Sequence, residues 1–253
     1  MCTKIRSKED LLKIYNNTKD IVNFRKEVSD STEKYHISVC GGTGCCSSNS
    51  MGIVEALKKY AKEYNVEDKV DISITGCFGF CERGPIVKIF PDHTFYTKVK
   101  VEDAEEIIRE HICNHNVVYR LLYQNEHGER ILTQDNINFY KKQHRLALRN
   151  CGLINPEVIG EAIGERAYQA LAKVLFDMTP DQVIEEVTKS GLRGRGGAGF
   201  PTGVKWKFAK ASVSEKKYII CNADEGDPGA FMDRSILEGD PHSVLESMAI
   251  AGY

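Results

Sequence analysis

Residues 191–206 read GLRGRGGAGFPTGVKW, and the rest of the sequence can be interpreted outward from this stretch. Its six glycines let another molecule approach the backbone closely and leave N–H groups free to point at one anion. Two arginines and a lysine add positive charge, so a phosphate is the expected guest. Aromatic rings at Phe200, Trp206 and Phe208 can stack on a nucleotide or flavin ring. A flexible linker would be richer in serine and would lack large aromatic residues.

The spacing of this loop differs from the common nucleotide-binding motifs. It lacks the Gly-Lys-Ser/Thr ending of a Walker A loop. Gly194, Gly196 and Gly199 fit a Gly-x-Gly-x-x-Gly pattern, but the Rossmann form needs a strand just before it. Residues 179–190 instead have the pattern of a helix. The loop therefore predicts a phosphate cradle for a flavin or nucleotide that is not an ordinary Rossmann turn.

Composition limits the classes of protein that fit. The 253 residues leave room for two domains, and a net charge of −2 gives no overall attraction to nucleic acid or anionic membranes. No apolar run approaches a membrane span and the first ten residues have no signal-peptide core, so we expect a cytoplasmic protein. Nine cysteines, an odd number, favour metal or redox use over disulfides.

Residues 35–113 have the pattern of a small α/β unit. Apolar and polar residues alternate in two strands, a helix lies between them, and a hairpin and a second helix follow. The expected elements are strands at 35–40 and 70–74, a helix at 53–64, a hairpin at 86–99 and a helix at 101–113. The order β-α-β-β-β-α is typical of a thioredoxin-like domain.

Four cysteines follow the expected strand ends in this unit, each near glycines: Cys40, Cys45, Cys77 and Cys81. Their pattern is Cys-x4-Cys, a gap of 31 residues, and Cys-x3-Cys. Four thiolates are what a [2Fe–2S] cluster needs, and glycines let two loops wrap a compact inorganic core. Structural zinc is the competing metal, but zinc sites usually have Cys-x2-Cys pairs, so the x4 and x3 spacings count against it. Buried structural cysteines without a metal are a second alternative.

Residues 35–113 resemble the thioredoxin-like [2Fe–2S] ferredoxin family, which also occurs as the 24-kDa subunit of respiratory complex I. The four cysteines match the ligand positions of that family. Cys46 has no counterpart in the pattern, so Cys45 is kept as the second ligand. The remaining cysteines have no paired spacing and are interpreted as ordinary small apolar residues: Cys2, Cys113, Cys151 and Cys221.

Residues 217–231 form a second polar site. The apolar run at 217–221 predicts a short buried strand, which opens onto the sequence NADEGDPGAF at 222–231. A strand end that opens onto polar groups is a usual ligand position in α/β folds, although an Asp/Gly/Pro turn would be the commoner interpretation of 222–231 alone. Its three carboxylates can accept hydrogen bonds from ribose hydroxyls or from the polar edge of a flavin.

Residues 145–253 resemble the family of the FMN- and NADH-binding 51-kDa subunit of complex I. Relatives of that family occur in NAD-reducing and electron-bifurcating hydrogenases and in NAD-linked formate dehydrogenases. The resemblance is carried by 191–206, by 222–227 and by the string DRSILEGDPH at 233–242. At Asp227 complex I members usually carry Glu. The string EGDPGAFM at 225–232 and the preceding [2Fe–2S] domain instead indicate the hydrogenase and formate dehydrogenase branch, with NADH-binding β subunits of electron-bifurcating [FeFe]-hydrogenases as the best match.

The resemblance implies roles for individual residues. It places the phosphate side of FMN at Gly194, Arg195, Gly196 and Lys205. It stacks the rings of Phe200 and Phe208 on the nucleotide and places Asn222, Asp224 and Glu225 along the flavin. A further hypothesis has Glu225 and Asp227 orienting the nicotinamide, and no catalytic acid or base is assigned. The implied cofactor-binding residues are Gly194, Arg195, Gly196, Gly197, Gly199, Phe200, Lys205, Phe208, Asn222, Asp224, Glu225 and Asp227.

The expected fold class is α/β (α+β), a thioredoxin-like [2Fe–2S] domain followed by the N-terminal part of the 51-kDa FMN-binding α/β domain. The expected divisions are an N-terminal helix at 1–32, the [2Fe–2S] domain at 33–116, a linker at 117–150 and the incomplete FMN/NADH-binding domain at 151–253. The basic run KKQHR at 141–145 is interpreted as a solvated face of the linker. Family members continue through a ubiquitin-like and a helical [4Fe–4S] domain, so the sequence is expected to be truncated at its C-terminus, and a [4Fe–4S] cluster is expected only in the missing part.

The implied function is that of an NADH dehydrogenase (diaphorase) subunit, which passes electrons between NAD(H), FMN and iron–sulfur clusters in a multisubunit hydrogenase of the electron-bifurcating type. Implied partners are a hydrogenase catalytic iron–sulfur subunit and a 24-kDa-like [2Fe–2S] subunit, with ferredoxin reached through the complex; neither nucleic acid nor a membrane span is implied. The alternatives are an NAD-dependent formate dehydrogenase or complex I flavoprotein subunit, and a non-catalytic [2Fe–2S] electron-transfer module.

Overall fold

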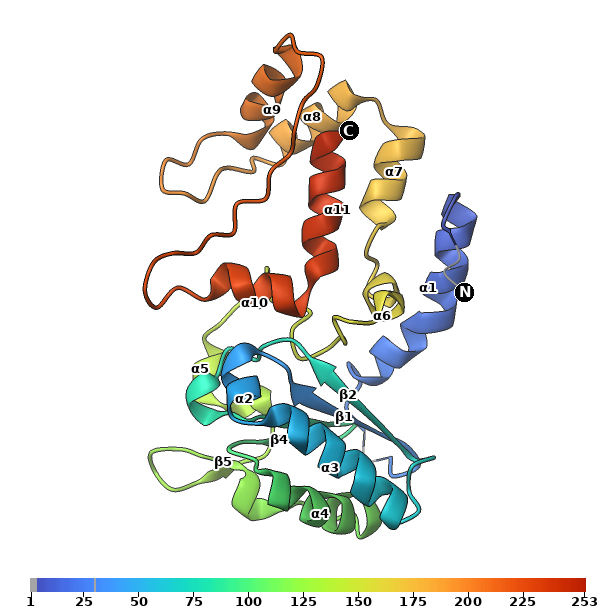
Figure 1. The fold of residues 1–253 in the computed structure, drawn as a ribbon, viewed down its shortest axis with the longest axis vertical. Helices are drawn as coiled ribbons and strands as arrows, with labels where there is room; N and C mark the ends of the chain where they lie inside the picture. Colours follow the sequence, from blue (N-terminus) through green and yellow to red (C-terminus); the bar gives the residue numbers. More distant parts are fainter. Residues whose placement is uncertain (1–3, 30) are drawn as a thin grey trace.

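A computed structural model describes residues 4–29 and 31–253 (Figure 1), so Cys2 lies outside the described residues. The first half of the chain folds around a sheet, and the second half consists of helices and extended segments (Figure 1). Across the described residues, none of the helices combines the length and the apolar character needed to span a bilayer.

A four-stranded sheet with the order β2-β1-β3-β4 organises the first half. The strand β1 is parallel to β2 and antiparallel to β3, and β3 pairs with β4. Because side chains alternate across a strand, Ile37 and Val39 of β1 face the helix that connects β1 to β2. The predicted order of strands and helices is confirmed, with short turns added. The bounds are β1 Tyr35–Cys40, α2 Thr43–Ser47, α3 Ser50–Glu63, β2 Val70–Thr75, β3 Val87–Phe90, β4 Thr94–Tyr96, α4 Ala104–Glu106 and a π-helical segment Ile107–Cys113.

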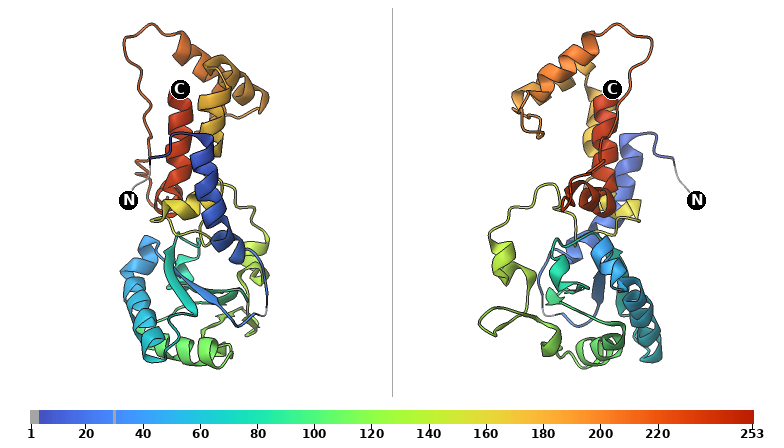
Figure 2. Two further views of the ribbon diagram at one scale, coloured as in Figure 1. Left: turned by 90° about the vertical axis from the view of Figure 1, so that its right-hand side faces the viewer. Right: turned by 60° about the vertical axis from the view of Figure 1, so that its left-hand side comes forward.

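The other face of the sheet is covered by residues that the sequence assigns to a linker. Figure 2 shows this segment and α3 on opposite sides of the sheet. Ile137 and Tyr140 are buried there against Phe78, Phe95 and Cys40. The elements are a short 3-10 turn Tyr119–Leu121, the hairpin β5 Tyr123–Gln124 and β6 Arg130–Ile131, a second turn Gln134–Asn136 and α5 Asn138–Lys141. The domain limits stay a prediction, but the segment packs as part of the first half.

The N-terminal helix α1 (Lys8–Phe24) joins the two halves. It lies within the expected 1–32 and begins after Ser7, whose hydroxyl accepts from the N–H of Asp10 at 3.2 Å. The helix packs along α6 (Ile159–Gly164), as both views of Figure 2 show. The contact is close, since a Cβ at Gly164 would lie 3.0 Å from the carbonyl oxygen of Thr18.

The second half is helical apart from two long loops. Helix α8 begins with the reciprocal bonds of a capping box, in which the N–H of Thr179 donates to Gln182 Oε1 at 2.8 Å and the N–H of Gln182 donates to Thr179 Oγ1 at 3.4 Å. The helices are α7 Gln169–Asp177, α8 Pro180–Lys189, α9 Thr202–Ala211, α10 Met232–Gly239 and α11 Pro241–Gly252.

The predicted strand at 217–221 is wrong. These residues lie in an irregular loop between α9 and α10, and the side chain of Ile220 is 84% exposed. A strand is stable only when its backbone groups pair with a neighbouring strand. Among the described residues, both sheets lie in the first half of the chain, so this apolar run has no partner.

Candidate metal centre and nucleotide-binding segments

Two loops at one end of the sheet bring the four predicted cysteines together. Cys40 ends β1 and lies in register with Thr75 at the end of β2, so the loops that follow both strands leave the same edge. The thiol of Cys40 contacts those of Cys45 and Cys77, and the sulfurs of Cys77 and Cys81 are 3.9 Å apart. Residues far apart in the sequence therefore form one cluster of thiols.

Glycines make this approach of the two loops possible. A Cβ at Gly42 would lie 2.8 Å from the Cβ of Cys77, and a Cβ at Gly84 would lie 2.6 Å from the sulfur of Cys45. Gly44 is less restricted, because its Cβ would meet Cys81 at 3.5 Å, an ordinary contact. Gly42 and Gly84 thus leave the space that the thiols occupy.

Backbone N–H groups point at three of the sulfurs. The N–H of Gly79 donates to Cys77 at 3.3 Å. The N–H groups of Phe78 and Ile86 face the thiols of Cys40 and Cys45, respectively, and favour their charged forms. Such donors stabilise negative charge on thiolate ligands and influence the reduction potential of a cluster.

Hydrogen bonds between the thiols and burial shift the pKa values of the four cysteines. The hydrogen bond to Cys45 raises the pKa of Cys40 to about 12, and the same bond lowers the pKa of Cys45. The bond to Cys40 raises the pKa of Cys77, and burial raises that of Cys81. Because metal ligation requires thiolates, these protons must leave when a metal binds.

The donor set fits a [2Fe–2S] cluster: two loops supply two thiols each, and the donating N–H groups and glycines surround them. No group of three or more His, Cys, Asp or Glu residues that could hold a single metal ion was found within 4–29 and 31–253. Cys46 is exposed and donates its thiol hydrogen to the Gly41 carbonyl at 3.1 Å, outside the four-thiol group.

Two of the unpaired cysteines differ in their surroundings. Cys151 is buried, as expected of a small apolar residue. Cys221 is exposed, so its interpretation as a buried apolar residue is wrong. The reason is that residues 217–221 form no strand and therefore have no core to enter.

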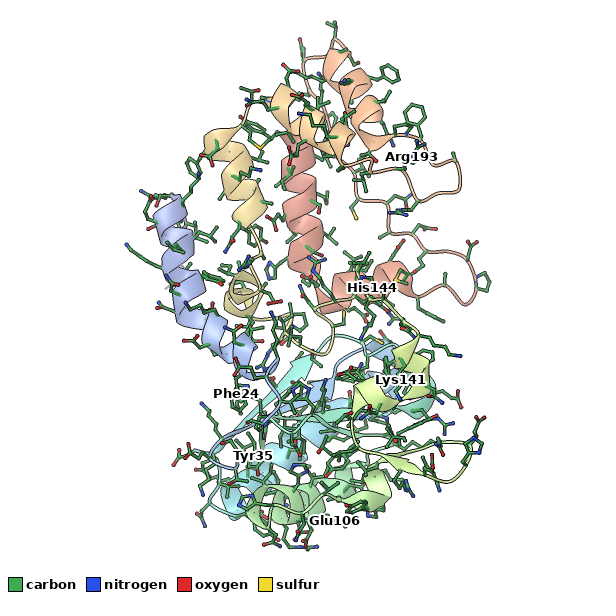
Figure 3. All side chains as sticks on the ribbon, turned by 180° about the vertical axis from the view of Figure 1, so that it is seen from behind. Phe24, Tyr35, Glu106, Lys141, His144 and Arg193 are labelled. Carbon is green, nitrogen blue, oxygen red and sulfur yellow. The ribbon has the colours of Figure 1, made fainter. Side chains whose placement is uncertain are left out.

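The glycine loop closes on itself at its base. The N–H of Gly194 donates to the Phe200 carbonyl at 2.9 Å, and Arg193, labelled in Figure 3, donates to the Gly199 carbonyl at 3.1 Å. At the tip, nothing lies within 4 Å of the position of a Cβ at Gly196, Gly197 or Gly199. The tip is therefore open to an incoming molecule.

Cationic and aromatic side chains surround this open loop. Arg195 and Lys205 are exposed, Lys205 in the first part of α9. The side chains of Phe200 and Phe208 are 48% and 66% exposed, which is unusual for phenylalanine. An exposed loop of this chemistry fits a phosphate and a flat ring.

The second segment, 222–227, is exposed and lies before α10. Glu225 has a φ of 49°, and its carboxylate accepts from the N–H groups of Asp233 at 2.7 Å and Arg234 at 3.0 Å. These bonds hold the pKa of Glu225 below its usual value. Asp224 and Asp227 line an open hollow beside Arg234. Glu225 thus anchors the start of α10.

The two predicted cofactor-binding segments lie in different loops, one before α9 and the other before α10. In the part of the chain that the structure describes, no hydrogen bond joins 191–206 to 222–227. The predicted cofactor-binding residues therefore form two exposed groups.

Helix α10 connects the second segment to the metal loops. At its far end, Thr43 Oγ1 donates to Glu238 Oε1 at 2.9 Å. A Cβ at Gly76 would lie only 2.5 Å from the Cα of Gly239, so the two backbones touch. The helix lies over α2 in Figure 1. The sequence string 233–242 thus meets the loops that carry Cys40, Cys45 and Cys77.

The comparisons with known protein families agree with this geometry. Residues 15–111 match the family of thioredoxin-like [2Fe–2S] ferredoxins, and residues 187–253 match the Nuo51 FMN-binding domain. Separate parts of the chain are thus similar to the two families, the first part to the ferredoxins and the last part to the FMN-binding domain. The resemblances seen in the sequence, the fold class and the [2Fe–2S] and FMN character of the two domain families are therefore confirmed.

Named relatives are similar to part of the chain. Over 113 residues the chain is 63% identical to the NADP-reducing hydrogenase subunit HndC of Solidesulfovibrio fructosivorans, covering 45% of this chain and 23% of the relative. Over 106 residues it is 47% identical to an NADH-quinone oxidoreductase subunit of Rhizobium meliloti (strain 1021), covering 42% and 25%. The chain spans about a quarter of the length of these relatives.

A solved structure similar to the ferredoxin domain is the thioredoxin-like [2Fe–2S] ferredoxin of Aquifex aeolicus. It is 28% identical, and the match covers 37% of this chain and 99% of that one with a TM-score of 0.34.

Sequence reasoning missed two side chains that touch the metal loop of the ferredoxin domain. The hydroxyl of Tyr140 donates to the Phe78 carbonyl at 2.9 Å, and Arg145 Nη2 donates to the Cys77 carbonyl at 3.3 Å. Arg145 belongs to the basic run interpreted as a solvated face, and that interpretation is wrong for this residue. No spacing in the sequence signals either contact.

Proposed function

We propose that the protein is a flavin- and iron–sulfur-dependent oxidoreductase subunit that exchanges electrons between a nicotinamide nucleotide and iron–sulfur clusters. The observation that carries the proposal is the position of α10. This helix begins at the carboxylate of Glu225, in the segment predicted to lie along the flavin, and ends against Thr43 and Gly76 in the metal loops. One helix therefore connects the two proposed cofactor sites.

When bound, FMN would accept two electrons from the nicotinamide and release them one at a time. The chain supplies binding and electrostatics. The glycine N–H groups, Arg195 and Lys205 would hold the phosphate. The N-terminus of α9, where Lys205 lies in the first part of the helix, adds the positive end of a helix dipole. The exposed rings of Phe200 and Phe208 would cover flat rings and exclude water from them. Cys40, Cys45, Cys77 and Cys81 would hold the [2Fe–2S] cluster.

For the nicotinamide end, the structure supports Asp227 over Glu225. The Glu225 carboxylate is already engaged by two N–H groups of α10, whereas Asp227 is exposed in the open hollow. We therefore assign Glu225 an anchoring role and Asp227 the orienting role. Asp227→Asn should raise the KM for the nicotinamide nucleotide with less effect on FMN content.

The hydrogenase branch is the proposed context. The identity of 63% to a hydrogenase subunit, against 47% to a quinone oxidoreductase subunit, supports it over complex I. Proposed partners are a hydrogenase catalytic iron–sulfur subunit and a 24-kDa-like [2Fe–2S] subunit, with ferredoxin as a further donor or acceptor in an electron-bifurcating complex. The cytoplasm is the proposed location, because its reducing conditions preserve free thiols.

Anaerobic reconstitution of the complete protein with iron, sulfide and FMN tests the proposal. We expect flavin bands that NADH or NADPH bleaches, together with iron–sulfur absorption. The double variant Arg195→Gln/Lys205→Gln should lower FMN content, and Lys189→Gln is the matched control because Lys189 lies on α8, where it pairs with Glu185. A colourless protein would contradict the proposal.

A second candidate is a [2Fe–2S] electron carrier without a flavin. The arrangement of the two sites favours it, because the four thiols already lie together, whereas the predicted FMN-binding residues are spread over two largely exposed segments. Iron–sulfur absorption without flavin bands in the same reconstitution would support this candidate.

A further inference from the structure

The metal loop at 76–81 is held from outside by the segment that follows α5. Tyr140 is buried, with its ring against Phe80 and Phe95, and its hydroxyl reaches the carbonyl of Phe78. Arg145 is half-buried and reaches the carbonyl of Cys77. Figure 3 labels Lys141 and His144 on this segment, which leaves α5 and runs toward the second half of the chain.

The two carbonyls belong to consecutive peptide groups. In a trans peptide the C=O and N–H point in opposite directions, so a bond that holds one of them also directs the other. In the peptide between Cys77 and Phe78, the C=O accepts from Arg145 and the N–H faces the sulfur of Cys40. In the next peptide, the C=O accepts from Tyr140 and the N–H of Gly79 donates to the sulfur of Cys77 at 3.3 Å.

Each peptide group is therefore fastened on its outer side by a side chain of 138–145 and directed on its inner side at a ligand sulfur. Hydrogen bonds in such a chain polarise one another, and a bond from a guanidinium is stronger than one from a neutral donor. Reduction adds one negative charge to a [2Fe–2S] cluster. N–H donors to the sulfurs stabilise that charge and so raise the reduction potential.

We propose that Tyr140 and Arg145 are positioning residues of the metal centre, which fix the two peptide groups so that their N–H groups face the sulfurs of Cys77 and Cys40 and raise the reduction potential of the cluster. The inference rests on the proposed assignment of the cluster to the four cysteines. It makes the segment after α5 a part of the metal centre rather than a linker.

The test is a redox titration of the complete protein, in which electron paramagnetic resonance follows the reduced cluster. Tyr140→Phe removes only the hydroxyl, and Arg145→Gln removes the charge. Because the net contribution of one hydrogen bond is modest, each variant should lower the ratio of reduced to oxidised cluster at a fixed potential by about two- to twelvefold. Arg145→Lys, which restores the charge, should recover part of this loss.

Two control variants separate positioning from general effects on the segment. Lys141→Gln removes an exposed positive charge from α5, and Tyr119→Phe removes a hydroxyl from a ring that is 69% exposed. Both should titrate as the parent does. If Tyr140→Phe and Arg145→Gln also titrate as the parent does, the proposal is overturned. A parent protein without any [2Fe–2S] signal would instead overturn the cluster assignment, and the proposal with it.

A second measurement decides the matter if a variant no longer takes up the cluster. In the metal-free protein, amide hydrogen exchange at Phe78 and Gly79 should be faster in Tyr140→Phe and Arg145→Gln than in Lys141→Gln, because the peptide groups lose their outer bonds. Equal exchange in all three variants would refute the positioning role.

Discussion

Replacing Glu161 by glutamine should destabilise the junction between the two halves of the chain. Arg25 at the end of α1 is only 1% exposed, and its guanidinium donates to His36 Nδ1 at 3.1 Å, to the Leu153 carbonyl at 2.9 Å and to both oxygens of Glu161. Glu161 also accepts from the N–H of Asn155 at 2.7 Å. The ion pair thus ties α1, the first strand and α6 together.

The magnitude follows from burial. Removing one partner of a buried ion pair costs about 3–5 kcal/mol when the other charge is left without compensation, and Arg25 would keep only a weaker partner in the half-exposed Asp71, 3.9 Å away. The introduced glutamine would keep the volume and one acceptor, so we expect a loss in the free energy of unfolding at the lower end of that range, about 3 kcal/mol. Glu165→Gln is the matched control, since its partner Lys26 is an exposed side chain, and such pairs contribute about 0–1 kcal/mol.

Urea unfolding of the metal-free chain, followed by circular dichroism, measures both variants. The double variant Arg25→Met/Glu161→Met should regain most of the lost stability, because two apolar side chains can replace a buried pair at little cost. A loss in Glu161→Gln no larger than that in Glu165→Gln would refute the reasoning, and so would a double variant less stable than Glu161→Gln.

Three further predictions concern the metal loops and the buried histidine. Cys45→Ser should lose bound iron, while Cys46→Ser should retain it, since only Cys45 lies among the four thiols; equal iron contents would reverse the assignment. Gly84→Ala should lower cluster content because its Cβ would lie 2.6 Å from Cys45, whereas Gly44→Ala, at 3.5 Å from Cys81, should be tolerated; the visible spectrum checks both. Burial and the Arg25 charge lower the pKa of His36 from 6.5, so stability should be full above pH 6.5 and fall as the pH drops below it; urea titrations should show this fall in the parent and a smaller one in His36→Gln.

The sequence predicted those features that depend on local pattern. The alternation in β1 and β2 identified the strands, and the glycines around Cys40, Cys45, Cys77 and Cys81 marked two loops that must come close together. The helical pattern at 179–190 identified α8, which begins at the cap formed by Thr179. In each case the signal lies within a few residues of the element that it forms.

What the sequence did not predict depends on contacts between distant segments. The run at 217–221 has the composition of a strand, but composition does not supply the neighbour that a strand needs. Arg145 belongs to a basic run, and only the path of the chain over the sheet brings it to Cys77. Glu225 was interpreted as a nicotinamide contact. No local pattern in the sequence indicates that its carboxylate binds the N–H groups at the start of α10 instead.

The contact between Gly76 and Gly239 has a consequence for the separation of the two proposed cofactor sites. Because no side chain lies between the two backbones, the metal loop and the end of α10 are in direct contact. The eight residues of α10 therefore set a distance of about 12 Å between Glu225 and the metal loop. Deleting one residue from that helix would shorten this distance by about 1.5 Å. It would also rotate Glu238 by about 100° around the axis, away from Thr43.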